Sequence, residues 1–299
     1  MRNSAEAQAK REVMRRIRRS RSPKKVIKTA LHYLFLSFVT AIFFAPIAYM
    51  LIGSLKPTAE VLGGLNGFAL VHLSFDNYLQ VFSTFNDDSM GYLWRFYANS
   101  ILVSFVIVFG GLIVNSMIAY SLARLRWRGR SAIQVLVVLL VILPFEAIAI
   151  PLFYLLRDYR NTYFVQFLPF IASAFSIYLF YTFFIGLPLE IQESARIDGA
   201  NPWRIYRAII VPMSKPVFAS VTILSFLSAW SSFLFPLMMV DNPLYVPLPL
   251  EIQVYFTQPP TDWGPIFAFG VILVIPVMAV FLLFQRWFIQ SVAASAIKG

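Results

Sequence analysis

Side chains able to carry out catalysis are scarce in this sequence. Its 299 residues include no cysteine and only two histidines, His32 and His72. Thiol catalysis, disulfides and cysteine-rich zinc sites are therefore excluded, and a histidine-based metal or acid–base centre is not expected. No G-x-x-x-x-G-K-[ST] run occurs, so the chain lacks the glycine-rich loop that cradles nucleotide phosphates. We expect no enzyme activity, no metal and no cofactor bound by this chain.

One carboxylate stands inside an apolar stretch. Glu146 lies between Pro144 and Pro151, in a run from about 132 to 156 that holds no other charge. A charge at the middle of a transmembrane helix costs ~2.5–3.5 kcal/mol on insertion scales, so such residues often face a water-filled cavity. Two readings stay open: Glu146 lines a translocation pathway, or it is a protonated residue within the helix bundle.

A second group combines aromatic rings with hydroxyls. Trp230, Ser231, Ser232 and Phe233 fall in the middle of an apolar stretch from about 214 to 239. Aromatic faces stack on the C–H faces of a sugar while hydroxyls bind its hydroxyl groups, so this set suits a sugar pathway. The alternative is packing, since serine lets transmembrane helices approach closely.

The same two readings apply to polar side chains in another stretch, from about 98 to 122. Asn115 is a further candidate for the pathway, as is Asn99 at the start of that stretch.

A pair of short helices is predicted at 187–216. The first covers Leu189–Asp198, with two glutamates in its first turns, and Gly199 can adopt the left-handed conformation that ends a helix. Asn201 followed by Pro202 is a cap and first-turn pair, so a second helix starts at once and is expected to end at about Val211.

The second of these helices carries an apolar stripe. Trp203, Tyr206 and Ile210 fall at i, i+3 and i+7 and therefore share one face. That face must be buried against something. The sequence leaves three choices: the protein's own transmembrane helices, lipid headgroups or a partner protein.

The composition explains what positions these residues. Hydrophobic residues make up 59% of the chain and charged residues only 13%, against roughly 25% in an average soluble domain. The sequence contains six apolar runs, each near the roughly 20 residues that span a bilayer. None of them alternates apolar and polar residues as a barrel strand does. We predict an all-α membrane protein with six transmembrane helices, at approximately 30–52, 98–122, 132–156, 164–186, 214–239 and 266–288.

Basic residues set the predicted orientation. Of the 25 lysines and arginines, 21 lie in the N-terminal tail, the loops after the second and fourth stretches, and the C-terminal tail. The positive-inside rule places both termini in the cytoplasm. The basic tail 1–29 is either an amphipathic helix on anionic lipid or a disordered tail that fixes topology. The net charge of +11 does not indicate nucleic-acid binding, because the basic residues do not form one folded face.

Two long segments are predicted on the opposite side of the membrane. Residues 53–97 look like a loop with short amphipathic pieces, and Trp94, Phe96 and Tyr97 form an expected interfacial anchor. The proline-rich segment 240–265 contains no basic residue and is expected to be a stiff, irregular loop.

The segment 187–213 resembles a known signature. Permeases of binding-protein-dependent ABC importers carry EAA, three residues, Gly, nine residues and I-x-L-P. This chain has Glu193-Ser194-Ala195, then Gly199, then Ile209-Ile210-Val211-Pro212 at the same spacing, with Ser194 and Val211 as departures. The run 193–200 is similar to the carbohydrate-uptake branch. So are Ala119–Arg124, Gly129-Arg130, Phe235-Pro236-Leu237 and Lys298-Gly299, and from about residue 30 to 299 the chain resembles the maltose-type second permease subunit.

The resemblance implies the architecture and the division of labour of a type I ABC importer. The permease domain, 30–299, would pair with a sister permease and receive solute from an extracytoplasmic solute-binding protein. An ATPase dimer that binds ATP–Mg would dock at 187–213, the cytoplasmic coupling helix–turn–helix. The implied coupling residues are Glu193, Ser194, Ala195, Asp198, Gly199, Trp203, Arg204, Tyr206 and Arg207.

The implied function is transport of a sugar or sugar derivative by alternating access, in the cytoplasmic (inner) membrane of a prokaryote. For Trp203 and Tyr206, packing against the protein's own bundle remains the alternative to docking. An ion-coupled secondary transporter is the competing function. It would normally have more intramembrane charge and an internal repeat, neither of which is clear here.

Overall fold

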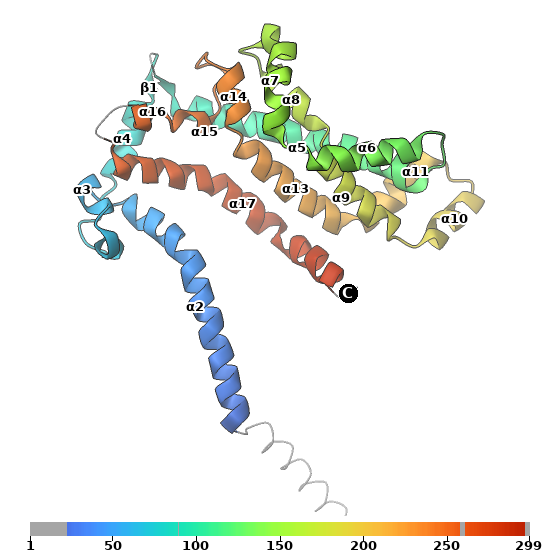
Figure 1. Cartoon of the computed structure of the whole chain (residues 1–299), viewed down its shortest axis with the longest axis horizontal. Coiled ribbons are helices and arrows are strands. Elements are labelled where there is room, and N and C mark those ends of the chain that lie inside the picture. The colour runs from blue at the N-terminus through green and yellow to red at the C-terminus, as the bar shows by residue number, and fades with distance from the viewer. Residues whose placement is uncertain (1–22, 89, 258–260, 297–299) are drawn as a thin grey trace, which may run out of the picture.

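The computed structural model of the chain describes residues 23–88, 90–257 and 261–296, which are almost entirely helical (Figure 1). The only strands in these ranges are β1 (Asn86–Asp87) and β2 (Gly91–Tyr92), an antiparallel pair. The long helices are α2 (Pro23–Gly53), α5 (Leu93–Arg124), α6 (Arg130–Ile142), α7 (Phe145–Leu156), α8 (Tyr163–Ile171), α9 (Ala174–Ile185), α13 (Lys215–Trp230) and α17 (Trp263–Ala296).

The short elements connect these helices. Around them lie α3 (Thr58–Val61), η1 (Gly64–Phe68), α4 (Asp76–Thr84), η2 (Arg157–Tyr159), α10 (Leu189–Ile197), α11 (Pro202–Ile205), η3 (Tyr206–Ile210), α12 (Val211–Met213), α14 (Leu234–Met239), α15 (Leu248–Glu251) and α16 (Val254–Thr257). The predicted all-α class is confirmed.

The membrane-spanning helices are less regular than six uniform rods. Within the described residues, four helices are long and apolar enough to cross a membrane: Ile27–Gly53, Leu93–Arg124, Tyr163–Ile185 and Trp263–Phe288. The count reaches six if each of two bent pairs is one span.

The third predicted span is one of these bent pairs. α6 and α7 meet at 104° instead of forming one rod over 132–156. The break falls at Leu143 and Pro144, where the proline has no N–H to continue the hydrogen-bond ladder and restricts the residue before it.

The fifth predicted span is broken as well. α13 ends at Trp230 and α14 begins at Leu234, so residues 230–233 are not in the middle of a helix as predicted. The Ser231 hydroxyl donates back to the Leu227 carbonyl at 2.7 Å, a bond that competes with helix continuation. Pro236 follows in the first turn of α14, where its missing N–H would be unpaired in any helix.

α5 is the central helix of the bundle. It packs against α8, α9 and α13, and α13 in turn packs against α17. Asn115, in the second half of α5, fixes the break between α8 and α9. Its amide donates to the Ile171 carbonyl at 3.0 Å and accepts from the Ser173 N–H at 2.9 Å.

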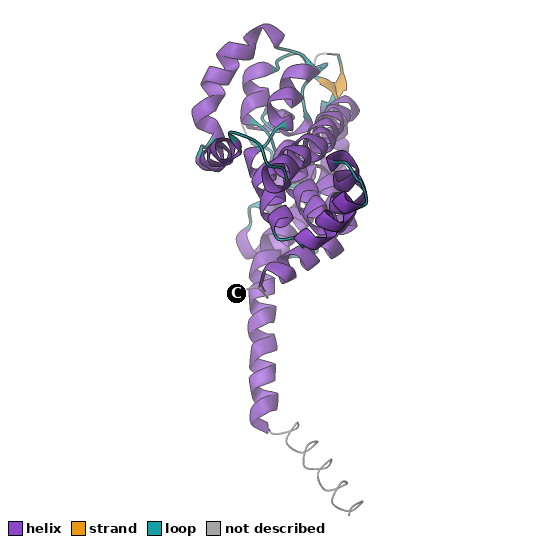
Figure 2. Ribbon diagram, turned by 90° about the vertical axis from the view of Figure 1, so that its right-hand side faces the viewer, coloured by secondary structure: helices purple, strands orange, loops and turns teal. Residues whose placement is uncertain are grey.

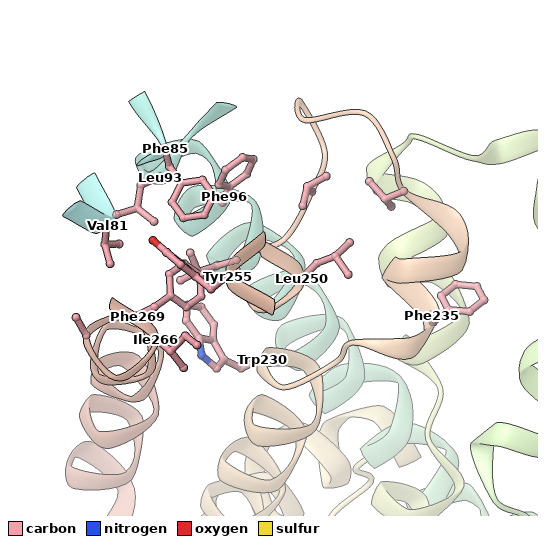
Figure 3. Close-up of a cluster of buried hydrophobic side chains, with 14 of the residues drawn as sticks. Val81, Phe85, Leu93, Phe96, Trp230, Phe235, Leu250, Tyr255, Ile266 and Phe269 are labelled. Carbon is pink, nitrogen blue, oxygen red and sulfur yellow. The ribbon is translucent and has the colours of Figure 1, made fainter. Parts of the chain in front are cut away.

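Two buried clusters lie towards opposite ends of α5. One gathers Phe85, Phe96, Tyr255 and Phe269 with Trp230 below them (Figure 3). The Phe85 ring meets the Phe96 ring edge-on, with the centroids 5.9 Å apart. Phe96 is thus a core residue rather than the interfacial anchor predicted for it. Trp94 next to it is exposed, as an anchor would be.

The described residues of the segments 54–92 and 240–262 close one end of the bundle, and we call them the cap. The segment after α14 is held on α5, because Asn99 donates to the carbonyls of Leu244 and Val246 at 3.0 and 2.9 Å. The Leu248 N–H donates to the Ser100 hydroxyl at 2.7 Å. The predicted irregular loop 240–265 therefore contains two short helices, α15 and α16, that pack on the transmembrane core.

A carboxylate in α15 makes the cap sensitive to pH. Burial raises the pKa of Glu251 from 4.5 to about 7, so the folded cap binds a proton more tightly than the unfolded chain. This tighter proton binding stabilises the folded cap relative to the unfolded chain. The stabilisation is complete below pH 4.5 and is lost as the pH rises through about 7, and it amounts to about 3 kcal/mol. Thermal unfolding in detergent should show a lower Tm at pH 8 than at pH 5. Glu251→Gln should remove most of this difference, and an unchanged difference in the variant would contradict the assignment.

α2 stands apart from the other helices. It meets α17 near the cap, where Met50 and Gly270 are in contact, and then diverges from the bundle (Figure 1). The view in Figure 2 shows the same separation. The helix begins at Pro23, ahead of the predicted boundary at residue 30. The last part of the predicted basic tail, 23–29, belongs to this helix, whereas 1–22 lie outside the described residues.

Candidate functional site

The turn between the two helices of the coupling segment, 187–213, is closed by backbone hydrogen bonds. α10 ends at Ile197 with Asp198 as its C-cap, and Gly199 follows with φ +79°. The Gly199 N–H donates to the Arg196 carbonyl at 3.0 Å and the Ala200 N–H donates to the Ala195 carbonyl at 2.9 Å. This pair of bonds is a Schellman motif, in which glycine supplies the left-handed residue.

The second helix starts as predicted. The Asn201 side chain accepts from the Arg204 N–H at 2.8 Å, and Pro202 occupies the first turn. The helix then runs through a π-helical turn, Tyr206–Ile210, and ends at Met213, two residues beyond the expected end at Val211.

Most of the predicted coupling residues lie on the surface. The side chains of Glu193, Ser194, Asp198, Arg204 and Arg207 are exposed, and Ala195 is half-buried.

Several large apolar side chains of this segment are also exposed, among them Leu189, Trp203 and Ile197. Trp203 is 55% exposed and Ile197 is 86% exposed. Sequence reasoning missed Ile197, although an isoleucine in a polar helix outside the apolar stretches was a usable signal. Apolar side chains exposed next to charges are typical of a protein-docking surface.

Tyr206 behaves differently from Trp203. It is only 7% exposed, and its hydroxyl lies 2.7 Å from the Ser116 hydroxyl on α5, with which it forms a hydrogen bond. Its ring packs 5.3 Å from the ring of Tyr120, whose hydroxyl donates to the Pro202 carbonyl at 3.1 Å. The prediction that Tyr206 faces a partner is therefore corrected: Tyr206 joins the coupling segment to α5.

An arginine at the end of α5 holds the start of the same segment. The Arg124 guanidinium is buried and donates to the Phe184 carbonyl and, at 2.6 Å, to the Leu187 carbonyl. These carbonyls lie at the C-terminal end of α9, where a positive charge is favourable. Sequence reasoning noted Arg124 within the family resemblance but gave it no role.

Removing this guanidinium should loosen the coupling segment. Arg124→Met would leave the Leu187 carbonyl without its donor, whereas the Phe184 carbonyl would keep the Leu187 N–H at 3.1 Å, and the loss costs about 1–3 kcal/mol. Hydrogen–deuterium exchange in detergent should be faster over 187–200 in the variant, while the cap stays unchanged. Arg124→Lys is the matched control, because an ammonium can still reach one carbonyl and should give an intermediate rate. Equal exchange in the wild type and Arg124→Met would contradict the role.

A cavity of about 780 Å³ lies against the other half of α5. Its walls come from α5, α6, α7, α8, α9, α13 and α14. Glu146, Ser231, Ser232 and Phe233 line it together, although 84 residues separate the glutamate from the first serine. Sequence reasoning did not identify the other polar side chains of the lining, which are Ser100, Ser104, Gln166, Ser173, Ser176, Ser225 and Ser228.

Asn99, a predicted pathway residue, does not line the cavity, because its buried side chain donates to the carbonyls of Leu244 and Val246. Two further predicted pathway residues also lie outside the cavity. Trp230 is 3% exposed and points to the opposite side, where its indole N–H donates to the Leu273 carbonyl on α17 at 2.9 Å. Asn115 is buried, and the break between α8 and α9 uses both its amide nitrogen and its oxygen. The packing alternative holds for both.

Known proteins resemble the chain over most of its length. Two curated relatives are the arabinooligosaccharides transport system permease proteins AraQ of Halalkalibacterium halodurans and Bacillus subtilis. They are 30% and 33% identical, over 95% and 89% of this chain and 100% and 94% of theirs. A chain of a bacterial ABC transporter that imports the acidic polysaccharide alginate is 25% identical, with a TM-score of 0.74 over 89% of this chain and 98% of that one.

A family match covers the coupling segment and most of the cavity wall. The family described as binding-protein-dependent transport system inner membrane component matches residues 111–294, more than half of the chain. With helices able to cross a membrane, an exposed two-helix segment tied to α5 and a polar cavity along the same helix, the chain belongs to this family of ABC importer permeases.

Proposed function

We propose that this chain is a transmembrane permease subunit of an ATP-driven importer that moves a sugar or sugar derivative across the cytoplasmic membrane of a prokaryote. The observation that carries the proposal is the placement of the coupling segment and the cavity on one helix. α5 carries Ser116 and Tyr120, which hold the coupling segment, and also Ser100 and Ser104, which line the cavity. A displacement of one site would therefore move the wall of the other.

The energy for that displacement would come from a partner. The chain has no phosphate-binding loop. A separate ABC ATPase dimer would therefore bind ATP–Mg, and its two subunits would close around the nucleotide. Trp203 and Ile197 would enter a cleft on the ATPase as apolar anchors, with Glu193, Asp198, Arg204 and Arg207 as polar contacts around them. Closure would then pull the coupling segment and α5 together and switch the cavity between two openings.

The other partners follow from the family. Binding-protein-dependent permeases take their solute from a binding protein, which would meet the cap on the outer side. A sister permease would supply the other half of the pathway and cover apolar surface that this chain leaves open. By the positive-inside rule, the distribution of basic residues supports a cytoplasmic location for both termini and the coupling segment.

The relatives support a carbohydrate as the solute. The curated relatives named above are permeases of arabinooligosaccharide transport systems, and the structural relative belongs to an alginate importer. Serine hydroxyls beside phenylalanine rings in the cavity fit the hydroxyl groups and C–H faces of a sugar.

Affinity purification in mild detergent, from cells that also express the neighbouring genes, tests this assignment. An ATPase and a second permease should co-purify with the chain. Both should be absent from a control purification without the affinity tag. A chain that purifies alone, with solute uptake that continues after ATP is depleted, would favour an ion-coupled secondary transporter instead.

A further inference from the structure

We propose that the cavity selects saccharides without negative charge, neutral sugars or amino sugars, over uronates and sugar phosphates. This inference rests on the proposed function and narrows its substrate class. The carriers related to this chain handle both neutral and acidic sugars, so the family alone does not decide between them.

Glu146 is the charged group that determines which solutes the cavity accepts. It lies in the first turn of α7, lines the cavity and is exposed there. Its carboxylate has no hydrogen bond or ion pair with any part of the chain that the structure describes. The described cavity lining contains no lysine, arginine or histidine. A single uncompensated negative charge therefore sets the sign of the field inside this half of the pathway.

An anionic solute would meet that field at short range. Water screens charges poorly in a cavity walled by apolar helices, so repulsion between two carboxylates is stronger there than in bulk water. Like charges brought together in such a setting disfavour binding by about a hundredfold. Hydroxyl groups have the opposite effect, because they donate charge-assisted hydrogen bonds to a carboxylate.

The rest of the polar lining is suited to hydroxyl groups. Ser104 and Gln166 line the cavity, and each is at least 97% buried. The Ser104 hydroxyl and the Gln166 side-chain oxygen have no hydrogen-bond partner within the described ranges. Buried polar atoms without partners are uncommon in folded proteins and require an explanation. A solute hydroxyl, which can both donate and accept, would satisfy either atom once its side chain turned towards the cavity.

The segments predicted on the outer side of the membrane, from which a solute would approach the cavity, also carry net negative charge. The segments 53–97, 157–163 and 240–265 contain eight carboxylates and four lysines and arginines. An ion pair of 2.8 Å between Arg160 and Asp241 joins the second and third of these segments. A surface with excess negative charge slows the approach of anions and leaves neutral solutes unaffected.

Uptake by the complete transporter, reconstituted in proteoliposomes with its sister permease, ATPase and binding protein, tests the inference. The probes are a neutral arabinooligosaccharide, an alginate oligosaccharide and the solute that co-purifies with the binding protein, whose charge is read by mass spectrometry. We expect that solute to carry no carboxylate, sulfate or phosphate. Glu146→Gln should lower its uptake about tenfold, because a charge-assisted hydrogen bond is replaced by a neutral one.

Asp158→Asn is the matched control. It removes the same charge at the outer end of the segment that begins with α7, and the Asp158 side chain is 89% exposed and does not line the cavity. Uptake of the neutral arabinooligosaccharide by Asp158→Asn should equal that of the wild type, because charge on the approach surface leaves neutral solutes unaffected.

Three results would overturn the inference. The first is a co-purifying solute that is anionic, and the second is uptake of the neutral arabinooligosaccharide that rises in Glu146→Gln. The third is loss of the sister permease from the Glu146→Gln complex, since Glu146 would then pair with a cation of that subunit. In each case ATP-driven uptake by the wild type leaves the proposed function standing, whereas its absence with every probe would refute the function itself.

Discussion

Replacing Gly199 by proline should abolish coupled transport while the chain still inserts into the membrane. Proline fixes φ near −65°, whereas Gly199 has φ +79°, and it removes the N–H that donates to the Arg196 carbonyl. Together these changes cost about 3 kcal/mol or more, so the docking conformation should become about a hundredfold rarer. ATP-driven uptake in proteoliposomes and ATPase co-purification measure the effect.

Gly199→Ala tests the effect of the backbone conformation at this position separately from the effect of side-chain volume. No atom lies within 4 Å of the position that an added Cβ would occupy, so alanine meets no steric obstacle. Only the left-handed conformation is strained, by ~1–2 kcal/mol, and uptake should fall by about tenfold. If Gly199→Ala and Gly199→Pro had equal uptake, or if both matched the wild type, the turn would not control docking.

Trp203→Ala should weaken ATPase binding with little effect on the stability of the chain. Trp203 is 55% exposed, so its removal leaves no internal cavity. Tryptophan anchors at the centre of an interface contribute about 2–4 kcal/mol on truncation, which corresponds to about thirtyfold weaker binding or more. The dissociation constant for the purified ATPase and the Tm of the chain in detergent are the two measurements.

Tyr206→Phe is the comparison variant and should have the opposite pattern. It removes the hydroxyl that bonds to Ser116 and leaves the ring contact with Tyr120 in place. The chain should lose about 1 kcal/mol of stability, while the affinity for the ATPase stays within about twofold. A large loss of ATPase affinity in Tyr206→Phe with none in Trp203→Ala would reverse the assignment of the two residues.

Features that depend on neighbouring residues in the chain could be predicted from the sequence. The C-terminal end of α10 requires a left-handed residue, and the Asn201-Pro202 pair requires a helix start, so the two-helix form of the coupling segment followed from local rules. Long apolar runs likewise indicated helices, since lipid cannot satisfy open backbone groups.

Features that depend on distant partners could not be predicted in this way. The orientation of Trp230 is decided by the Leu273 carbonyl, 43 residues away on another helix, and that of Asn115 by the break between α8 and α9. Tyr206 shares its helix face with Trp203, yet α5 covers only one of the two rings. Hydrophobic periodicity identifies a face that must be covered, but it does not identify the partner.

The positions of the helix breaks in the bundle could not be predicted from composition either. Pro144 ends a helix, whereas Pro151 and Pro276 lie inside helices without ending them. Neighbouring helices and local adjustments can satisfy the backbone groups that a proline frees within a membrane, so the proline alone does not fix the outcome.

ATP-driven uptake with the purified complex in proteoliposomes decides whether transport is driven through the coupling segment. We expect accumulation of the solute delivered by the binding protein, dependent on ATP inside the vesicle and lost in Gly199→Pro. We also expect that ATP hydrolysis in the presence of the binding protein falls with uptake in that variant. Uptake that proceeds without ATP, or that is undiminished in Gly199→Pro, would contradict a permease driven through the coupling segment.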